Sequence, residues 1–363
     1  MVETPRLIAL RAEAAKFQEQ LNVYEIRWRD RQVFLASQGY MLRPRYRPGW
    51  VPSWKTDTSR HPRKNEDYWD LPLREHLIDA TRISDGRLVY VKRVKTGDTE
   101  STIARMLSSS RFSEDPRNHC VPILDYFADE DDTTIAYMVM PFLRLTDDPP
   151  FETVNDIIDY GNQMIQGLVF MHEQQVAHRD CSEKNIMMDA DSLFPKGYHP
   201  VRSNYLPDAC TLAPRLWRAK GHIKYYYVDF GISVHLPTDS PKLVVGGYGR
   251  DQDVPELSFD VPYDPFKVDI FILGNMFKRE IYDNYSNVDF LLPFINAMTQ
   301  NDPKARPDAP EAEKIWGNIC AKVSGLQRGW RLRGRKEVWV QKVVLDTYTT
   351  VRRIFGWVTD LQG

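Results

Sequence analysis

The fold of this chain is decided by the stretch Val176-Ala177-His178-Arg179-Asp180-Cys181-Ser182-Glu183-Lys184-Asn185-Ile186-Met187. This stretch places a carboxylate, Asp180, shortly before an amide, Asn185. A second stretch, Tyr225-Tyr226-Tyr227-Val228-Asp229-Phe230-Gly231, is rich in strand-forming residues and ends close to another carboxylate. Tripeptides such as His-Arg-Asp and Asp-Phe-Gly also occur by chance in solvated loops. These tripeptides therefore indicate a fold only if related motifs occur later in the chain.

Three further patterns occur in order. Val254-Pro255-Glu256 lies 25 residues after Asp229. An apolar run then begins at Asp269, and Arg306 comes later in an Asn-Asp-Pro context. Together, the five ordered motifs resemble those of the eukaryotic protein kinase superfamily. Small-molecule kinases of related fold generally lack the third and fifth motifs, so the resemblance is to protein kinases.

The resemblance implies an α+β, two-lobed fold with a small β-rich N-lobe and a larger helical C-lobe. The order of predicted elements agrees, because strands dominate the first part and helices the second. The expected organisation is an N-terminal helix and a strap over 1–66, an N-lobe over 67–143, a C-lobe over 144–320 with an insertion over 191–224, and a basic helical extension over 321–363.

Local patterns predict the main elements. Residues 75–95 predict a β-hairpin, because Ser84-Asp85-Gly86 separates two strand-forming runs. Apolar spacings predict helices over 3–22, 98–109 and 153–174, and strands over 121–127 and 134–142. Residues 39–65 are rich in proline, arginine and aromatic residues. We expect them to form a strap outside any sheet, with Tyr46, Trp50 and Trp54 docked on the main domain.

The resemblance assigns roles in the C-lobe. It implies that Asp180 accepts the proton of a substrate hydroxyl and that Asn185 and Asp229 bind Mg²⁺. Ser182 stands where many serine/threonine kinases have a lysine, and Lys184 is the candidate that supplies this positive charge near the transferred phosphoryl group. The resemblance further implies that Asp269 braces the catalytic-loop backbone and that Glu256 and Arg306 form a buried ion pair.

The N-lobe is expected to hold ATP. The run Val89-Tyr90-Val91-Lys92 resembles the strand whose lysine grips the α- and β-phosphates, and Glu100 is then its helix partner. Lys95 is a competitor, although the position of Gly86 favours Lys92. By the same resemblance, the residues that line the adenine pocket are Leu77, Met140 as gatekeeper, Pro141 through its carbonyl and Leu143 through its amide.

The chain also departs from the family pattern. Residues 70–77, where the glycine-rich loop should lie, contain no glycine. Tyr90 replaces a small residue above adenine and narrows the pocket unless its ring turns outward. The gap from Asn185 to Asp229 is 44 residues instead of about a dozen, and long loops in compact domains are usually functional or disordered. These departures, with the segments 118–122 and 194–197, resemble an expanded group of kinase-like proteins in mushroom-forming fungi.

The sequence supports two interpretations of function. The first is a protein kinase that uses ATP and Mg²⁺, with serine or threonine acceptors favoured over tyrosine. The second is a pseudokinase scaffold without turnover, which the missing glycine-rich loop and Tyr90 favour. The substrate protein is not identified by the sequence. A formal net charge of −2 gives no electrostatic case for nucleic acid, and no apolar run is long enough to cross a membrane. Four scattered cysteines and the absence of a secretory signal predict an intracellular location, cytoplasmic or nuclear.

The sequence leaves two alternatives for how the loop between Gly231 and Glu256 is ordered. The loop between Gly231 and Glu256 contains Thr238 and Ser240, either of which is a candidate phosphosite whose phosphate would dock on Arg179. In the other alternative, the loop is ordered without a phosphate and Arg179 binds a loop carbonyl or an acidic residue such as Asp239.

Overall fold

The computed structural model describes residues 18–71, 75–347 and 349. Contacts divide the chain into two compact units, each of which gathers stretches that are far apart in the sequence. The first unit contains the described residues up to Ser101 with Pro122–Leu143 and Asp189–Gly221, and the second contains Thr102–Val121, Arg144–Met188 and the chain from His222. Antiparallel sheet and helices occur together, which confirms the expected α+β class.

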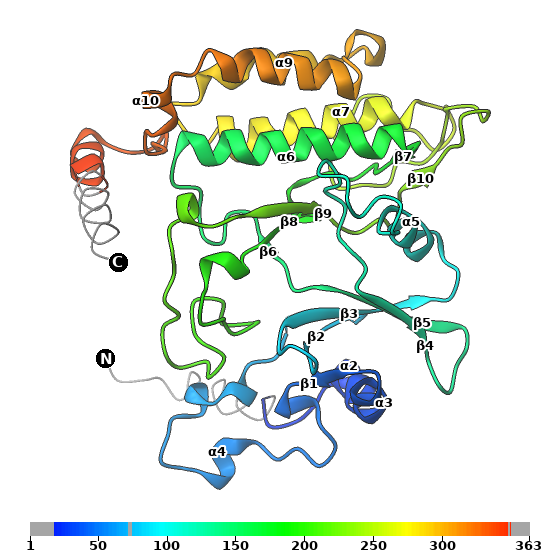
Figure 1. Ribbon diagram of the computed structural model, residues 1–363, viewed down its shortest axis with the longest axis vertical. Helices are drawn as coiled ribbons and strands as arrows, with labels where there is room; N and C mark the ends of the chain where they lie inside the picture. Colours follow the sequence, from blue (N-terminus) through cyan, green and yellow to red (C-terminus); the bar gives the residue numbers. More distant parts are fainter. Residues whose placement is uncertain (1–17, 72–74, 348, 350–363) are drawn as a thin grey trace, which may run out of the picture. The chain divides into compact units, whose positions relative to one another are not determined.

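The first unit is built on a five-stranded antiparallel sheet with the order β1-β2-β3-β5-β4 (Figure 1). Its strands are β1 (Tyr40–Leu42), β2 (Leu77–Arg82), β3 (Leu88–Lys95), β4 (Asp125–Ala128) and β5 (Ile135–Pro141). The predicted hairpin is confirmed, since β2 pairs with β3 and Gly86 between them has a φ of +73° that glycine adopts readily. The strand predicted over 121–127 begins only at Asp125, because Val121 donates instead to the Tyr227 carbonyl at 2.9 Å.

The sheet includes three residues that we expected to lie outside it. Tyr40–Leu42 pairs with β2 as an edge strand, so the prediction of a strap without sheet pairing over 39–65 is wrong at its start. Tyr40 and Leu42 alternate into the core, with 4% and 0% of their surface exposed, as in a half-buried strand. This three-residue strand was not predicted from the sequence, because the residues that follow it are rich in proline. Further along the strap, Tyr46 and Trp54 are buried as expected.

Two helices complete the core of the first unit. Helices α2 (Val23–Asp30) and α3 (Gln32–Ser37) pack Trp28, Phe34 and Leu35 against the inward side chains of the sheet. Burying each such side chain stabilises the fold by about 1.5–3 kcal/mol. Asn22 begins α2 with a capping box. The helix predicted over 3–22 falls largely on residues 1–17, which lie outside the described residues.

Short helical turns shape the remainder of the first unit. They are α4 (Ser53–Thr56), η1 (Pro44–Tyr46), η2 (Pro62–Lys64), η3 (Glu66–Tyr68), η5 (Asp191–Leu193) and η6 (Arg218–Lys220). The last two belong to the predicted insertion, which packs on the strap. His199 contacts Glu66 at 3.4 Å, and the Arg202 guanidinium lies 4.7 Å from the Trp69 ring centroid. We call residues 40–71 and 189–221 together the strap-and-insertion region.

Helices dominate the second unit, as predicted. They are α6 (Val154–Glu173), α7 (Pro265–Met276), the π-helical turn η7 (Phe277–Tyr282), α8 (Leu292–Met298), α9 (Ala309–Ala321) and α10 (Gly325–Arg328), with the short turns η4 (Glu183–Asn185), η8 (Asp289–Leu291) and η9 (Pro303–Ala305). Helix α5 (Thr99–Leu107) begins in the first unit and ends in the second. Asp98 caps the start of α5, because its side chain accepts from the Ser101 amide at 2.8 Å. Of the predicted C-terminal extension, residues 339–347 are helical, and residues 348 and 350–363 lie outside the described part.

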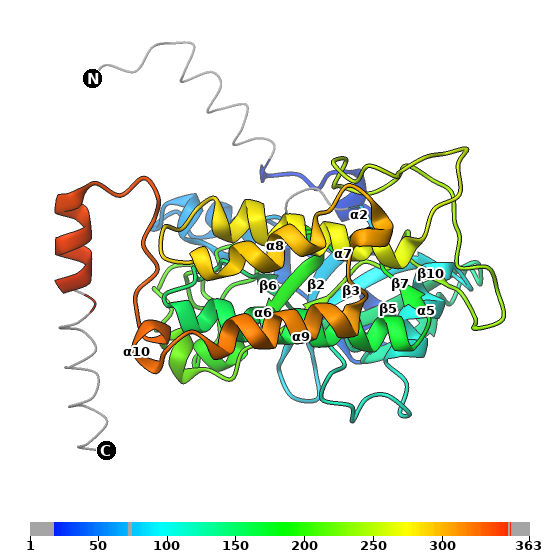
Figure 2. The same ribbon diagram turned by 90° about the horizontal axis from the view of Figure 1, so that it is seen from above.

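The long helix α6 organises the second unit. Thr153 caps it through a capping box with Asp156, so the helix predicted over 153–174 is confirmed. Helix α9 packs on α6, and Figure 2 shows the two helices running side by side. The two helices approach closely at Gly161, where an added Cβ would lie only 2.1 Å from Trp316 Cζ2. Glycine is therefore required there to admit the Trp316 indole between the helices.

Short strands carry the motif residues of the second unit. They are β6 (Arg144–Leu145), β7 (Val176–Ala177), β8 (Ile186–Asp189), β9 (Lys224–Tyr227) and β10 (Val234–His235). Strands β6, β8 and β9 form one small sheet, and β7 pairs with β10 in another. The catalytic-loop stretch therefore runs from β7 to β8, and the Asp-Phe-Gly motif follows β9.

Candidate active site

A buried carboxylate holds the catalytic-loop backbone. Asp269, on α7, is fully buried and accepts from the main-chain amides of His178 at 2.8 Å and Arg179 at 2.6 Å. It also lies 3.0 Å from Nε2 of His172. Arg179 has a φ of +66°, a left-handed conformation that is unfavourable for a residue with a side chain. The bonds from Asp269 fix this turn, which confirms the predicted bracing role.

Asp180 and Asn185 form a hydrogen-bonded pair. The Asn185 side-chain nitrogen donates to Asp180 Oδ2 at 2.8 Å and to the Asp180 carbonyl at 2.9 Å. Its amide oxygen is therefore the atom left to bind a cation. The other carboxylate oxygen, Asp180 Oδ1, accepts from the main-chain amide of Arg250 at 2.9 Å.

The strand that precedes Asp229 is tied to the same loop. The Val228 amide donates to the Asn185 carbonyl at 2.9 Å, and His178 Nε2 lies 3.1 Å from the Val228 carbonyl. Burial lowers the pKa of His178, so its ring is neutral, with Nε2–H as donor and Nδ1 as acceptor for the Asp180 amide. Asp229 itself has a φ of +65°. These bonds tie Val228, the residue before Asp229, to the loop that contains Asp180 and Asn185.

The oxygen atoms of this group suit Mg²⁺ in a nucleotide complex. Among the described residues, no three His, Cys, Asp or Glu side chains cluster as a closed metal site. Mg²⁺ at nucleotide sites needs only one or two protein carboxylates, because phosphates and water supply the remaining ligands. The carboxylate of Asp229 and the amide oxygen of Asn185 therefore fit the ion through an open, shared site.

Lys184 stands at the edge of this group. It is exposed and borders a hollow of about 340 Å³ with Glu183, Glu280 and the α6 residue Tyr160. Burial, followed by the nearby Glu183 charge, raises the pKa of Glu280, and Lys184 opposes this shift. Lys184 therefore places its positive charge within a largely acidic hollow beside the catalytic loop.

The late motif residues meet as predicted. Arg306 is fully buried at its side chain and bonds Glu256 through two contacts, NH1 to Oε1 at 2.5 Å and NH2 to Oε2 at 2.8 Å. It also donates to the main-chain carbonyls of Gln300 and Lys267. The predicted ion pair is confirmed, although the two residues are 50 positions apart.

Arg179 is occupied without a phosphate. Its guanidinium donates to the carbonyls of Ile232 at 3.2 Å and Val245 at 3.2 Å, and to the Tyr263 hydroxyl at 2.8 Å. Tyr263 and Val244 exchange two main-chain hydrogen bonds of 2.9 Å, which hold this part of the loop in place. Arg179 thus makes the loop-carbonyl bonds expected in the second regulatory alternative.

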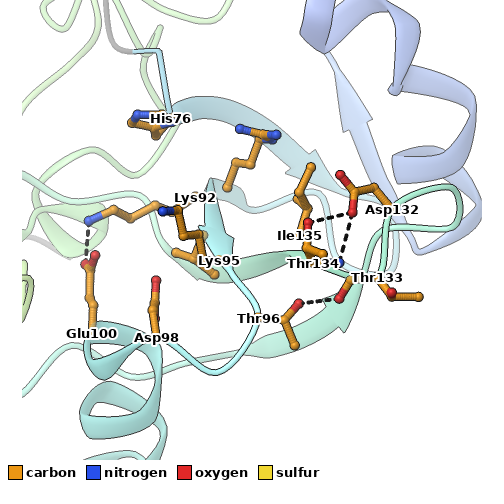
Figure 3. Close-up of a pocket in the computed structure, with 12 residues that line it drawn as sticks. His76, Lys92, Lys95, Thr96, Asp98, Glu100, Asp132, Thr133, Thr134 and Ile135 are labelled. Carbon is orange, nitrogen blue, oxygen red and sulfur yellow. Dashed lines mark hydrogen bonds and ion pairs between the residues drawn. The ribbon is translucent and has the colours of Figure 1, made fainter.

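The expected Lys92–Glu100 ion pair is present in the first unit. Lys92, on β3, forms an ion pair with Glu100, on α5, and both side chains are largely shielded from solvent. Figure 3 shows Lys92 extending to Glu100 within an open hollow of about 910 Å³. The competitor Lys95 is exposed at the end of β3. The structure thus distinguishes the two lysines in favour of Lys92.

The residues expected around adenine lie on the same sheet. Leu77 is the register partner of Lys92, and Met140 is the partner of Tyr90. Pro141 ends β5, and Leu143 is buried two residues later. Tyr90 stacks on Phe142, with ring centroids 4.3 Å apart and an interplanar angle of 25°. Its ring is therefore held against the segment that follows β5.

The sequence reasoning missed two contributors to the second unit. They are the main-chain amide of Arg250, which bonds Asp180, and the hydroxyl of Tyr263, which bonds Arg179. The available signal was the run of glycines from Gly246 to Gly249, two of which have φ near +125°. Such glycines mark a close approach of two backbones.

A known protein kinase shares part of this sequence. The chain is 24% identical over 161 residues to the serine/threonine-protein kinase CAK1 of Saccharomyces cerevisiae. The match covers 39% of this chain and 37% of the relative, so the chain spans little more than a third of that protein's length in the comparison. No protein-family model matches the chain. The similarity is therefore a distant, partial relationship to a protein kinase.

Within residues 18–71, 75–347 and 349, no helix combines the length and the apolar character that a transmembrane span needs.

Proposed function

We propose that this protein transfers the γ-phosphoryl group of ATP to a hydroxyl group of a protein. The observation that carries the proposal is the Asp180–Asn185 hydrogen bond, together with the bond from the Val228 amide to the Asn185 carbonyl, which ties the residue before Asp229 to the same loop. The Lys92–Glu100 pair and the partial similarity to a serine/threonine kinase support it. In this proposal, residues 67–143 are the N-lobe and residues 144–320 the C-lobe of a protein kinase.

Each residue has a distinct task. Asp180 accepts the proton of the attacking hydroxyl, and its two hydrogen bonds hold the carboxylate in orientation. Lys92, held by Glu100, binds phosphate oxygens. Leu77, Met140, Pro141 and Leu143 form the adenine contacts.

The metal ligands have a separate role. Asn185 and Asp229 would hold Mg²⁺, which neutralises phosphate charge when bound. Lys184 supplies further positive charge from the edge of the catalytic loop. Positioning and charge neutralisation account for most of the rate in phosphoryl transfer, so the arrangement needs no covalent intermediate.

The finer assignments extend the same proposal. The name of the relative favours serine or threonine as acceptor. The four cysteines are free thiols, which suits the reducing interior of a cell, where ATP is available. The pseudokinase alternative rests on Tyr90 and on the lack of glycine in residues 70–77, of which 72–74 lie outside the described part. The relative gives it no support.

The test compares wild type with Asp180→Asn. We expect wild type to transfer labelled phosphate from Mg-ATP to a general acceptor such as casein, with the label on serine or threonine. Asp180→Asn should lose at least about 100-fold in rate, because a positioned base contributes roughly this much. Matched melting temperatures provide the control for folding. Equal transfer by the two proteins would overturn the proposal.

A further inference from the structure

We propose that the main-chain N–H of Arg250 is a positioning group that orients the Asp180 carboxylate for proton acceptance. The inference rests on the proposed phosphoryl transfer and adds a group that the motif pattern does not contain. Arg250 acts through its backbone, so its side chain is not part of the inference. The evidence is the geometry of the segment from Gly246 to Asp251.

The Asp180 carboxylate is held at both oxygens. Oδ1 accepts from the Arg250 amide at 2.9 Å, and Oδ2 accepts from the Asn185 side chain at 2.8 Å. Rotation of an aspartate carboxylate about its last bond is soft. One donor would leave this rotation free, whereas donors at both oxygens fix the plane. Each oxygen retains acceptor capacity, so the base can still receive a substrate hydroxyl.

Glycine brings the donor to this place. Gly249 has a φ of +125°, and an added Cβ would lie 3.2 Å from the Arg179 carbonyl and 3.8 Å from Asp180 Oδ1. Gly246 has a φ of +124°, and its Cβ would lie 2.9 Å from the Arg179 guanidinium. The loop can approach the catalytic loop this closely only because side chains are absent at both positions.

The amide is fixed from both sides along the chain. Before it, the Gly249 carbonyl accepts from Gln252 Nε2 at 2.7 Å. After it, Asp251 is buried and accepts from Asn275 on α7 at 2.8 Å, and it lies 3.3 Å from the Arg279 guanidinium. The donor therefore belongs to a loop that is tied to α7, the same helix that holds the catalytic-loop backbone through Asp269. Such preorganisation is what a positioning group requires.

The experiment replaces the main-chain N–H of residue 250 with an ester oxygen. In an Arg250→Ala chain, the alanine is exchanged for lactic acid, which converts the amide between positions 249 and 250 into an ester and removes only the N–H. With Mg-ATP and casein, we expect kcat to fall about 10- to 100-fold relative to Arg250→Ala, while KM for ATP stays within about twofold. Equal kcat in the two chains would overturn the inference.

Two controls complete the test. The ester also weakens the Gly249 carbonyl as an acceptor, so Gln252→Ala is measured, and an equal fall in that variant would assign the effect to the lost Gln252 bond. Wild-type protein with ¹⁵N-labelled arginine tests the contact without turnover. The Arg250 amide proton should move upfield in Asp180→Ala, and an unmoved resonance would contradict the contact. If this shift is observed but wild type transfers no phosphate, the proposed function fails and the contact stands.

Discussion

In two regions of the molecule, buried charged side chains link segments that are far apart in the sequence. The regions differ in the residues that these links hold in place. In the catalytic-loop region, residues 176–185 with 229–263, Asp269 and Arg306 hold motif residues in place. In the strap-and-insertion region, Arg43 and Arg45 bond acidic partners and main-chain carbonyls. The first set of bonds holds the loop that contains Asp180, for which we propose a catalytic role. The second set holds residues to which the proposal gives no role.

The strap-and-insertion region shows how much buried charge can serve structure alone. Arg43 bonds Asp79 at 2.7 Å, with only 8% and 0% of the two side chains exposed. Arg45 bonds Glu25 at 2.5 Å and is 1% exposed. The insertion adds His199, which is fully buried and accepts from two main-chain amides. A buried ion pair is therefore weak evidence that a region is catalytic. Solvent-accessible residues connected to such a pair are better candidates for a functional site.

The largest effect is expected at Asp229. Asp229→Asn should reduce Mg-ATP-dependent transfer by about 10³-fold or more, because it removes a charged metal ligand. Its stability should change little, since asparagine tolerates the φ of +65° as well as aspartate does. Transfer rate and melting temperature are measured together. Unchanged transfer would show that the catalytic-loop region, like the strap-and-insertion region, serves structure alone.

Arg306 tests the structural part of the catalytic-loop region. Arg306→Ala should lower the free energy of unfolding by about 3–5 kcal/mol, because Glu256 loses its buried partner. The matched control is Lys304→Ala, since Lys304 is exposed two residues away and its loss should stay within about 0.5 kcal/mol. Urea unfolding measures both. A similar small loss in the two variants would mean that the pair contributes nothing to the fold.

Buried His119 should make the stability of the fold depend on pH. Burial lowers the pKa of His119 to about 4, from 6.5, so the unfolded chain takes up a proton before the folded chain does. Stability should therefore fall as pH drops from 6.5 to 4, with about 3 kcal/mol from this residue. We expect His119→Gln to remove that part of the slope in unfolding measurements from pH 7 to 4. An unchanged slope would contradict the assignment.

The strap-and-insertion region should affect stability without affecting transfer. His199→Ala removes the acceptor of the Val201 and Arg202 amides and should cost about 1–3 kcal/mol of stability. We expect kcat to stay within about twofold at a temperature where both proteins are folded. A large fall in kcat at unchanged melting temperature would break the distinction between the two regions.

The smallest effect is expected in the loop that contains Thr238 and Ser240. Arg179 is already bonded to loop carbonyls and to Tyr263, so a phosphate is not needed to order this segment. The Thr238→Ala/Ser240→Ala double variant should keep wild-type transfer within about twofold. Mass spectrometry establishes the phosphorylation state of both proteins. Loss of transfer in the double variant would instead support regulation by a phosphate on Thr238 or Ser240.

Much of the catalytic-loop region could be predicted from sequence because its side chains have fixed spacing. Asp269 and the Glu256–Arg306 pair are indicated by motif order, and in the first unit the Lys92–Glu100 pair is indicated by resemblance to the family's strand and helix motifs. The Arg250 amide could not be predicted, because every residue except proline carries an N–H. Only the φ values of the neighbouring glycines reveal why this one reaches Asp180.

Two features of the strap-and-insertion region could not be predicted from the sequence, for a different reason. Glu66 and His199 are 133 residues apart, and no motif links them. Strand β1 has only three residues, too few for an alternating pattern to stand out beside prolines. Tertiary partners, which a single sequence does not display, decide both features.

The central claim is that the residues around Asp180 catalyse phosphoryl transfer and need no loop phosphate. The most direct measurement is the initial rate at which phosphatase-treated wild-type protein transfers labelled phosphate from ATP to casein, with Mg²⁺ and with excess EDTA. We predict Mg²⁺-dependent transfer at least about 100-fold above the Asp180→Asn background. A rate equal to that background, from protein that is folded, would contradict the account.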